Sequence, residues 1–544
     1  MTGSTDDQTG QPSFSDGFDA LDMHQYRIER LPKREHSGLE RYLAMCGVPL
    51  SFLAFVVFGF FWTPEFISAF DVSVLPEQAL KQLNKSGTEK FIASNAFMLA
   101  IFMLSIILWS TASIPNYLTS LIVIIATVLT GILSEQQAYA QLGHPVMWLN
   151  IMSFILASAL VSTGLAKRYT LWLIIRFGRS ASSILFTFIV INVTLSAFIS
   201  ATTAKAALLL PIFMVVAAIY GAQPGKGESN FGRNIVLQNL LNINLGAGAF
   251  MTGSGANLLA VALISGAIAG NIFYTDWMMA MLPTMLGLML IGYLVGMRIF
   301  FPLAEKEKIP QIEGGMERLK EELRALGPIN FREIRAAVTF ICILGFWATD
   351  NLHGISPTAV AFVGATLTLM PKIGVVEWND VDIPWHLMLF SAGAYVLGAG
   401  LADTGLPNIA VAAFFSWVGV DASTPFWVLY LLLTGVMCYS ALLSQSKTMR
   451  AMIFVPIAIG TAQLFDHNVI SLALPVAFMI EHVYTLPFNS KPAALLYETD
   501  HYSITDAFRY GFTMMTIAWI TIIVMGETWF RFLGITPQGV FGWF

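Results

Sequence analysis

Ser446-Lys447-Thr448 is the stretch that decides the fold, because it breaks an otherwise apolar run. These residues stand ten, nine and eight positions before Pro456. A second polar break, Ala201-Thr202-Thr203, stands at the same distances before Pro211. Polar breaks at matching places in the two halves of an apolar chain are typical of carriers that bind their substrate near the bilayer midplane.

Cations accompany both breaks. Lys205 and Arg450 each follow the threonine of their break by two residues. Lys447 lies inside the second break, and Lys491 interrupts the next apolar run. Charged side chains are rare and costly at membrane depth, where they mark functional sites. The pattern therefore indicates a cavity that binds a negatively charged substrate.

The composition excludes a soluble protein. The chain has 544 residues, of which 56% are hydrophobic and 12% charged, whereas soluble domains carry about 25% charged residues. Many apolar runs reach the length of about 20 residues that a membrane-spanning helix needs. We predict an all-α polytopic membrane protein in a lipid bilayer. The net charge of −5 comes without a basic stripe, which excludes a nucleic-acid partner.

We expect about eleven transmembrane helices plus two re-entrant hairpins in two inverted repeats. The chain divides into a disordered cytoplasmic tail (1–37), a first half with the first inverted repeat and its hairpin at 182–220 (38–301), a solvated, partly helical cytoplasmic linker (302–335), and the second inverted repeat with its hairpin at 424–464 (336–544). Clusters of lysine and arginine place the N-terminus in the cytoplasm, and we expect a bacterial inner membrane. Asp350, at a predicted span end, is expected to be solvated.

The predicted hairpin tips carry hydroxyl groups. A half-helix that begins at membrane depth presents free N–H groups and a partial positive charge of about half a unit, which suits an anion. Thr202, Thr203, Ser446 and Thr448 add hydroxyls that can donate to a carboxylate or coordinate a cation. The alternative is that these hydroxyls only cap the helices.

Glu481 is the nearest acidic residue expected within the membrane, and His482 follows it. One interpretation is an ion pair of Glu481 with Lys447 or Lys491. The other is a cation-rich cavity for a doubly charged substrate, with Glu481 or His482 as a candidate proton site. Asn257 lies in a further break, where its amide oxygen suits Na⁺ or its side chain caps a helix.

These motifs resemble those of the divalent anion:sodium symporter family, which carries dicarboxylates, citrate and sulfate. The family's Ser-Asn-Thr motif occurs twice, and Ala201-Thr202-Thr203 and Ser446-Lys447-Thr448 match it. The family's Gly-Thr-Pro-Pro-Asn loop matches Gly253-Ser254-Gly255-Ala256-Asn257, and its second copy matches residues 486–494. The resemblance covers roughly residues 94–532.

The resemblance implies a homodimer that moves its substrate by an elevator-like motion. It also implies a small anion, a dicarboxylate by default, between the hairpin tips and a Na⁺ beside each tip as coupling ion, without another cofactor. The substrate-binding residues expected from the pattern and the resemblance are Thr202, Thr203, Lys205, Ser446, Lys447, Thr448, Arg450, Ser254, Ser490 and Lys491. The residues expected at a Na⁺ are Thr202, Thr203 and Asn257.

The chain departs from the family motifs at these same positions. Thr202 and Lys447 replace the asparagines of the two tips, Ala201 replaces a serine, and Lys491 and Ala493 replace a proline and an asparagine of the second loop. A lysine ammonium cannot coordinate Na⁺, because it has only donors. We therefore hypothesise that Lys447 supplies the charge of the second Na⁺ and that only a weak first Na⁺ site survives.

Other anions and other functions stay open at this point. The altered tips leave sulfate, a sulfonate or another oxyanion as substrate, and H⁺ coupling or Na⁺-independent exchange as alternatives to symport. An anion channel would also use broken helices. A membrane-embedded enzyme is less well supported, because the chain has no His-Glu-x-x-His and no Gly-x-Ser-x-Gly sequence.

Overall fold

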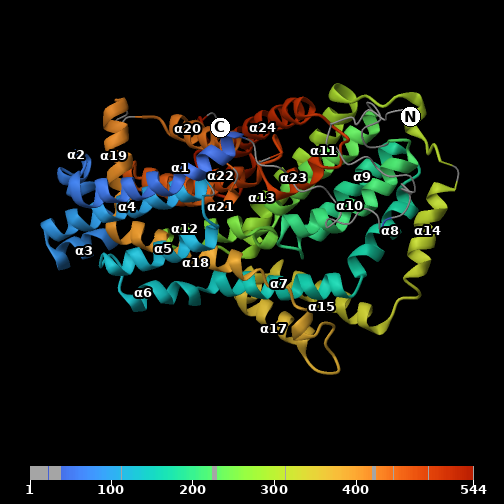
Figure 1. The fold of residues 1–544 in the computed structure, drawn as a ribbon, viewed down its shortest axis with the longest axis horizontal. Coiled ribbons are helices and arrows are strands. Elements are labelled where there is room, and N and C mark those ends of the chain that lie inside the picture. Colours follow the sequence, from blue (N-terminus) through green and yellow to red (C-terminus); the bar gives the residue numbers. More distant parts are fainter. Residues whose placement is uncertain are drawn as a thin grey trace, which may run out of the picture.

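A computed structural model describes Met23 and residues 38–111, 113–222, 229–312, 314–419, 424–444, 446–487 and 489–542, without the side chains of residues 38–44 and 418. The predicted tail, residues 1–37, lies outside the described residues apart from Met23. Every regular element in the described ranges is a helix (Figure 1). The prediction of an all-α chain is confirmed for this part of the protein.

Fourteen α-helices precede residue 326 in the described ranges, and the last of them lies in the linker. They are α1 (Gly38–Val56), α2 (Glu65–Ser68), α3 (Glu77–Ser86), α4 (Thr88–Thr111), α5 (Asn116–Leu129), α6 (Glu135–Ala140), α7 (Pro145–Ser162), α8 (Leu165–Phe177), α9 (Ala181–Ser196), α10 (Thr202–Ile219), α11 (Asn230–Ala249), α12 (Gly255–Ile268), α13 (Tyr274–Val295) and α14 (Gly315–Ala325). The short or π-helical turns are η3 (Val57–Phe61), η4 (Val72–Val74), η5 (Gln141–Gly143), η6 (Met251–Gly253), η7 (Gly296–Phe300) and η8 (Glu305–Lys308).

The second half follows a similar order of elements. Its helices are α15 (Phe331–Trp347), α16 (Asp350–His353), α17 (Pro357–Leu369), α18 (Trp385–Thr404), α19 (Leu406–Val418), α20 (Phe426–Tyr439), α21 (Lys447–Leu464), α22 (Val469–Phe478), α23 (Lys491–Tyr497), α24 (Ile504–Glu527) and α25 (Trp529–Phe532). Its short turns are η9 (Trp378–Asp380), η10 (Ser440–Leu442) and η11 (Met479–Glu481).

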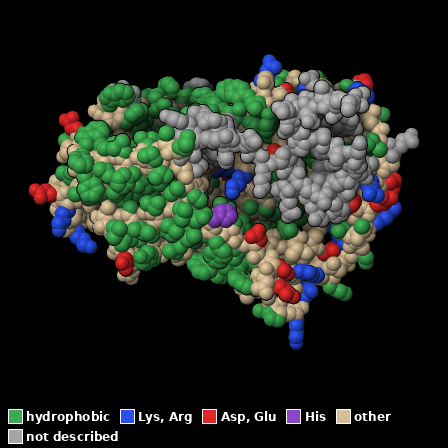
Figure 2. All heavy atoms as spheres, in the orientation of Figure 1, with side chains coloured by type: hydrophobic (Ala, Val, Ile, Leu, Met, Phe, Trp, Pro, Cys, Tyr) green, Lys and Arg blue, Asp and Glu red, His purple; other side chains and the backbone are tan. Residues whose placement is uncertain are grey.

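The helices are suited to a membrane. Six helical segments among the described residues are long and apolar enough to cross a bilayer, and eight shorter apolar helices accompany them. Large apolar side chains remain exposed, for example Phe61, Leu129 and Trp417. Figure 2 shows hydrophobic side chains over most of the left half of one face, with charged side chains at its two ends and lower edge and a few near its middle. Such a surface is stable against lipid and not against water. The chain is an integral multi-pass membrane protein.

Four broken helix pairs lie where the sequence predicts polar breaks. In the first half, α9 and α10 flank residues 197–201, and η6 separates α11 from α12. In the second half, residues 440–446 separate α20 from α21, and residues 479–490 separate α22 from α23. The two halves meet at these breaks, because α12 packs against α21 and α22, and α10 packs against α23 (Figure 1).

Two apolar runs that the sequence presents as continuous are each split at a glycine. Gly164 (φ +72°) separates α7 from α8, and Gly405 (φ +65°) separates α18 from α19. A residue in the left-handed conformation interrupts a helix. Glycine suits this position, because residues with a Cβ clash in that conformation. The runs at 147–177 and 385–417 are therefore two helices each.

The linker is partly helical, as predicted, but it is not simply solvated. Arg168 of α8 lies 2.6 Å from the Glu333 carboxylate, and Lys167 lies 3.0 Å from that of Glu322. Glu333 and Glu307 are buried. The basic residues of α8 attract the acidic residues of the linker, which places this segment against the helices instead of in solution.

Asp350 is buried, contrary to the expectation that it is solvated. Its carboxylate accepts hydrogen bonds from the backbone N–H of Tyr274 (2.7 Å) and Thr275 (3.2 Å) and from the Thr275 hydroxyl (2.5 Å). The free N–H groups and the positive end of α13 stabilise the carboxylate. This contact joins α13 to the start of the second half.

Candidate functional site

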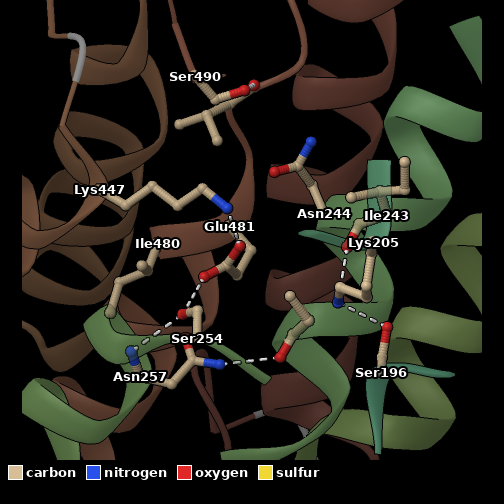
Figure 3. A network of polar contacts seen from close by, with 12 residues as sticks. Ser196, Lys205, Ile243, Asn244, Ser254, Asn257, Lys447, Ile480, Glu481 and Ser490 are labelled. Atoms are coloured by element: carbon tan, nitrogen blue, oxygen red, sulfur yellow. Dashed lines mark hydrogen bonds and ion pairs between the residues drawn. The ribbon is translucent and has the colours of Figure 1, made fainter. Parts of the chain in front are cut away.

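Lys447 is the first residue of α21 and points toward a buried carboxylate. Ser446 caps this helix, and its hydroxyl accepts the N–H of Met449 at 3.2 Å. The Lys447 ammonium lies 2.5 Å from Oε2 of Glu481 in η11 (Figure 3). The side chains are 12% and 1% exposed, so this pair is largely withdrawn from water. The structure shows the ion pair with Lys447, one of the two interpretations of Glu481.

Glu481 also reaches the first half of the chain. Its Oε1 accepts a hydrogen bond of 2.5 Å from the hydroxyl of Ser254, which caps α12 (Figure 3). The same hydroxyl accepts the N–H of Asn257 at 3.3 Å. One carboxylate therefore connects the break between α11 and α12 to the start of α21, and both of its oxygens are used.

Two glycines allow the break between α11 and α12 to pack closely against its neighbours, among them Glu481 of η11. A Cβ at Gly253 would lie 2.1 Å from the Ala247 carbonyl oxygen, and a Cβ at Gly248 would lie 2.4 Å from the Met285 side chain and 3.4 Å from Cγ of Glu481. The backbone of η6 folds back onto α11 only because Gly253 has no side chain. This close packing positions Ser254 beside Glu481.

Asn257 holds the end of α11 and leaves one oxygen unused. Its Nδ2 donates to the carbonyl oxygens of Ala247 (2.9 Å) and Phe250 (3.1 Å). Its Oδ1 is buried without a hydrogen-bond partner among the described residues. No hydrogen bond in the described part joins Asn257 to Thr202 or Thr203, which are half-buried at the start of α10.

Lys205 lies in the first turns of α10 and is completely buried. Its ammonium donates to the Ser196 hydroxyl at 2.8 Å and to the Ile243 carbonyl oxygen at 3.3 Å (Figure 3). It is close enough to Glu481 and Lys447 to interact with both electrostatically. Two neutral oxygens therefore hold this cation, and no carboxylate bonds to it directly in the described part of the chain.

Arg450, one turn into α21, is also completely buried. It donates to the Ser440 hydroxyl (3.0 Å), to the carbonyl oxygens of Ile480 and Met479 (3.2 Å each), and to that of Met437. These contacts hold the end of α20 against η11. Most of the guanidinium donors are thus used by the protein itself, although the sequence suggested contact with the substrate.

The remaining predicted residues range from exposed to completely buried. Ser490 caps α23, accepting from Ala493 N–H at 3.2 Å, and its hydroxyl donates to the Val483 carbonyl at 3.2 Å. Lys491 is exposed, and no ion pair with Glu481 is seen among the described residues. Thr448 is half-buried. His482 is completely buried, with its ring 5.2 Å from that of Phe478.

Two further residues lie among the broken helices and were not predicted as site residues. Asn489 donates to the Ala441 carbonyl at 2.5 Å and accepts from the Leu486 N–H at 2.6 Å, which ties the break between α22 and α23 to η10. Ser196 is the hydroxyl partner of Lys205. Asn489 lies within a polar break, which is a signal for it. Ser196 lies in an apolar half-helix, and nothing in its surroundings in the sequence distinguishes it.

Comparison with known proteins places the chain in a family. A family model described as the sodium:sulfate symporter transmembrane region matches residues 89–536. A membrane protein of Cupriavidus necator is 26% identical over 459 residues, covering 80% of this chain and 87% of the relative. The sodium-dependent dicarboxylate transporter SdcS of Staphylococcus saprophyticus is 24% identical over 455 residues (79% and 85%). The chloroplastic dicarboxylate transporter 1 of Arabidopsis thaliana is 24% identical over 456 residues (82% and 80%).

The family match spans most of the chain and includes all of the broken helices described above. The resemblance noted from the sequence is confirmed, and the protein is a transporter and not an enzyme. The chain belongs to the sodium:sulfate symporter family of membrane transport proteins.

Proposed function

We propose that this protein carries a small divalent organic anion, a dicarboxylate, across the membrane, with Lys447 in place of the second Na⁺. The observation that carries the proposal is the position of the Lys447 ammonium at the start of α21. It makes one hydrogen bond among the described residues, to Glu481, and an ammonium has three donors. Two donors are thus left for a ligand at this helix start.

The proposed binding site lies between the starts of α10 and α21. Both helices have 18 residues, and their first N–H groups and dipoles favour an anion. Ala201 gives α10 no side-chain cap, so its first N–H groups are left for a ligand. The hydroxyls of Thr202, Thr203 and Thr448 complete the site, with the contributions of Ser254, Ser490 and Lys491 at its edge. The relatives named as dicarboxylate transporters support this class of anion.

The proposed transport cycle is an elevator-like motion in a homodimer. The two halves, 38–301 and 336–544, would form inverted repeats with about eleven spans and two re-entrant hairpins, 182–220 and 424–464, joined by the linker 302–335. The repeated order of broken helices supports this arrangement. The N-terminus would face the cytoplasm of a bacterial cell from the inner membrane.

The residues present do not fit a second Na⁺. Lys447 offers donors where a cation needs oxygen ligands, and the Glu481 oxygens are taken by Lys447 and Ser254. At the first site, Asn257 Oδ1 is a buried oxygen without a partner among the described residues. One Na⁺ at most would therefore bind there. Glu481 is the better candidate proton site, because His482 is enclosed by aromatic rings.

The proposal is tested by binding and transport of defined anions. Thermal melting of the purified protein with succinate, malate, citrate, sulfate and a small sulfonate, with and without Na⁺, should show the largest stabilisation with a dicarboxylate. Uptake of labelled succinate into proteoliposomes should saturate and support counterflow. Stabilisation by sulfate or the sulfonate alone would show that such an oxyanion, and not a dicarboxylate, is the substrate. A conductance far above carrier turnover would contradict the carrier mechanism.

A further inference from the structure

The helices around the candidate site and those beside the linker form two groups, each packed within itself. In the site group, α11 packs against α9, α10 and α13. This group carries Lys205 on α10, and its helix α11 leads into the break that holds Ser254. In the support group, α17 packs against α7 and α15. Figure 1 shows the support group along the lower side of the molecule and α9, α10 and α11 at the upper right.

The chain itself joins the two groups at the end that bears the linker. There α8 connects α7 to α9, and the linker with α14 connects α13 to α15. Figure 1 shows α8 and α14 packed side by side at the right end of the molecule. These covalent connections persist whatever the relative position of the two groups. A polar contact at the opposite ends of α13 and α15 fixes that position.

Asp350 makes this contact. It lies in α16, directly after α15, and its buried carboxylate accepts the Tyr274 N–H (2.7 Å), the Thr275 N–H (3.2 Å) and the Thr275 hydroxyl (2.5 Å) at the start of α13. The Tyr274 ring stacks on that of Trp347 in α15, with the ring centroids 4.9 Å apart. The Trp347 indole donates to the Pro357 carbonyl at the start of α17 (3.0 Å), which places Asp350 with the support group.

The contact can open toward water. Asn351 and Asp276 lie beside it, are exposed, and are joined by a hydrogen bond of 3.0 Å. Polar side chains at this edge are stable in water, which can enter and replace the hydrogen bonds of Asp350 at a modest cost in free energy. A displacement of about 2 Å along α13 breaks the three bonds together, because a hydrogen bond is lost beyond about 3.5 Å.

We propose that Asp350 is a latch between the two groups, which is closed in the orientation seen here and opens in each transport cycle. This inference rests on the proposed elevator-like motion, in which the site group moves and the support group stays. No residue of the candidate site hydrogen-bonds to the Asp350 carboxylate among the described residues. Opening of the latch is therefore required for transport and not for binding of the anion.

A reversible crosslink tests whether the latch has to open. The full-length protein carries Asp276→Cys and Asn351→Cys in a background of Cys46→Ala, Cys342→Ala and Cys438→Ala. A short bis-methanethiosulfonate should join the pair in proteoliposomes, because the native side chains are 3.0 Å apart. The crosslink should lower uptake of labelled succinate at least about tenfold, since a blocked conformational step limits turnover, and dithiothreitol should restore it. Succinate should raise the melting temperature of the crosslinked and the reduced protein equally, because the site is unchanged.

The outcomes separate the latch from the proposed function. Each single-cysteine variant treated with the reagent is a control and should keep its uptake. Full uptake by protein that mass spectrometry shows to be crosslinked would overturn the latch and leave the dicarboxylate carrier intact, because α13 and α16 would then move as one body. A pair that does not crosslink would contradict the closed contact. Absence of succinate counterflow in the wild type would instead contradict the proposed function.

Variants of the latch distinguish its role from that of a permanent helix cap. Asp350→Asn keeps the size of the side chain and removes its charge, and Thr275→Val removes the shortest of the three bonds. Both should slow crosslinking of the cysteine pair several-fold, because the contact is closed for a smaller fraction of the time.

Thr349→Val is the matched control for these variants. Its hydroxyl is exposed and donates to the Gly345 carbonyl of α15, so the crosslinking rate should not change. An unchanged crosslinking rate in a well-folded Asp350→Asn protein, judged by thermal melting and monodispersity, would contradict the role of Asp350. If that variant does not fold, the milder Thr275→Val decides in the same way.

Discussion

The Lys447 ammonium and the Glu481 carboxylate lie 2.5 Å apart, where the start of α21 meets the break between α22 and α23. Glu481 in turn accepts the Ser254 hydroxyl from the other half of the chain. The pair therefore positions the lysine at the start of α21 and also joins the two broken loops. Removal of either partner should change both the substrate charge that the protein prefers and the stability of the protein.

Glu481→Gln should keep a hydrogen bond to Ser254 and remove the negative charge. Lys447 then loses its partner, and the formal charge of the group Lys205, Lys447, Arg450 and residue 481 rises from +2 to +3. We expect the preference to shift from succinate toward the trianion citrate, because one more negative charge is needed for neutrality. Competition of unlabelled citrate and succinate against labelled succinate at neutral pH measures this shift. An unchanged preference would show that Glu481 does not set the charge of the site.

The same variant should lower stability by about 1–3 kcal/mol, because a mostly buried cation loses its charged partner but remains 12% exposed to solvent. Thermal melting in detergent measures the change. The double variant Glu481→Gln with Lys447→Met should recover part of the loss, since it leaves no unpaired charge. If the two single effects simply add, the pair does not contribute as a pair.

Arg450→Lys should destabilise the protein even though the charge is kept. The guanidinium reaches four acceptors on three segments, and a lysine ammonium cannot span them. We expect a loss of about 2–4 kcal/mol, in the range for breaking a buried hydrogen-bond network. Arg318→Lys on the exposed face of α14 is the matched control and should have little effect. Normal melting with altered substrate affinity would instead place Arg450 in contact with the substrate.

Acidification should destabilise the loop between α23 and α24. Burial lowers the pKa of His501 below its ordinary value of 6.5, so the unfolded chain binds the proton more readily than the folded one. The stability contribution is complete above pH 6.5 and is lost as the pH falls toward the lower folded pKa. His501→Gln should therefore show a smaller fall in melting temperature on acidification than the wild type. His386→Gln, at an exposed position, should follow the wild type.

The sequence predicts the breaks in the helices better than it predicts their partners. Polar residues in apolar runs indicate where α10, α21 and the paired loops begin, because unsatisfied backbone is costly in lipid. The contact of Ser254 with Glu481 joins residues 227 positions apart and has no local signal. The burial of Asp350 at the start of α13 depends in the same way on packing between distant helices.

The positive charge of a residue also does not predict which role it has once it is buried. Lys447 and Arg450 lie three positions apart on α21, yet one faces a carboxylate and the other four backbone or hydroxyl oxygens of neighbouring segments. Residues three positions apart lie on the same face of a helix, and both side chains reach η11, so the arrangement of η11 decides which oxygens each one contacts. The sequence places both near the site and does not separate the two roles.

The most direct test of the role of Lys447 is uptake of labelled succinate into succinate-loaded proteoliposomes with Na⁺ replaced by choline, for the wild type and Lys447→Asn. We predict full wild-type exchange in choline and a loss of about tenfold or more in the variant, because the anion loses one positive charge in a poorly solvated site. Strict Na⁺ dependence of the wild type with a steepness above one would contradict the replacement of the second Na⁺ by Lys447. Unchanged transport and ion dependence in Lys447→Asn would contradict it equally.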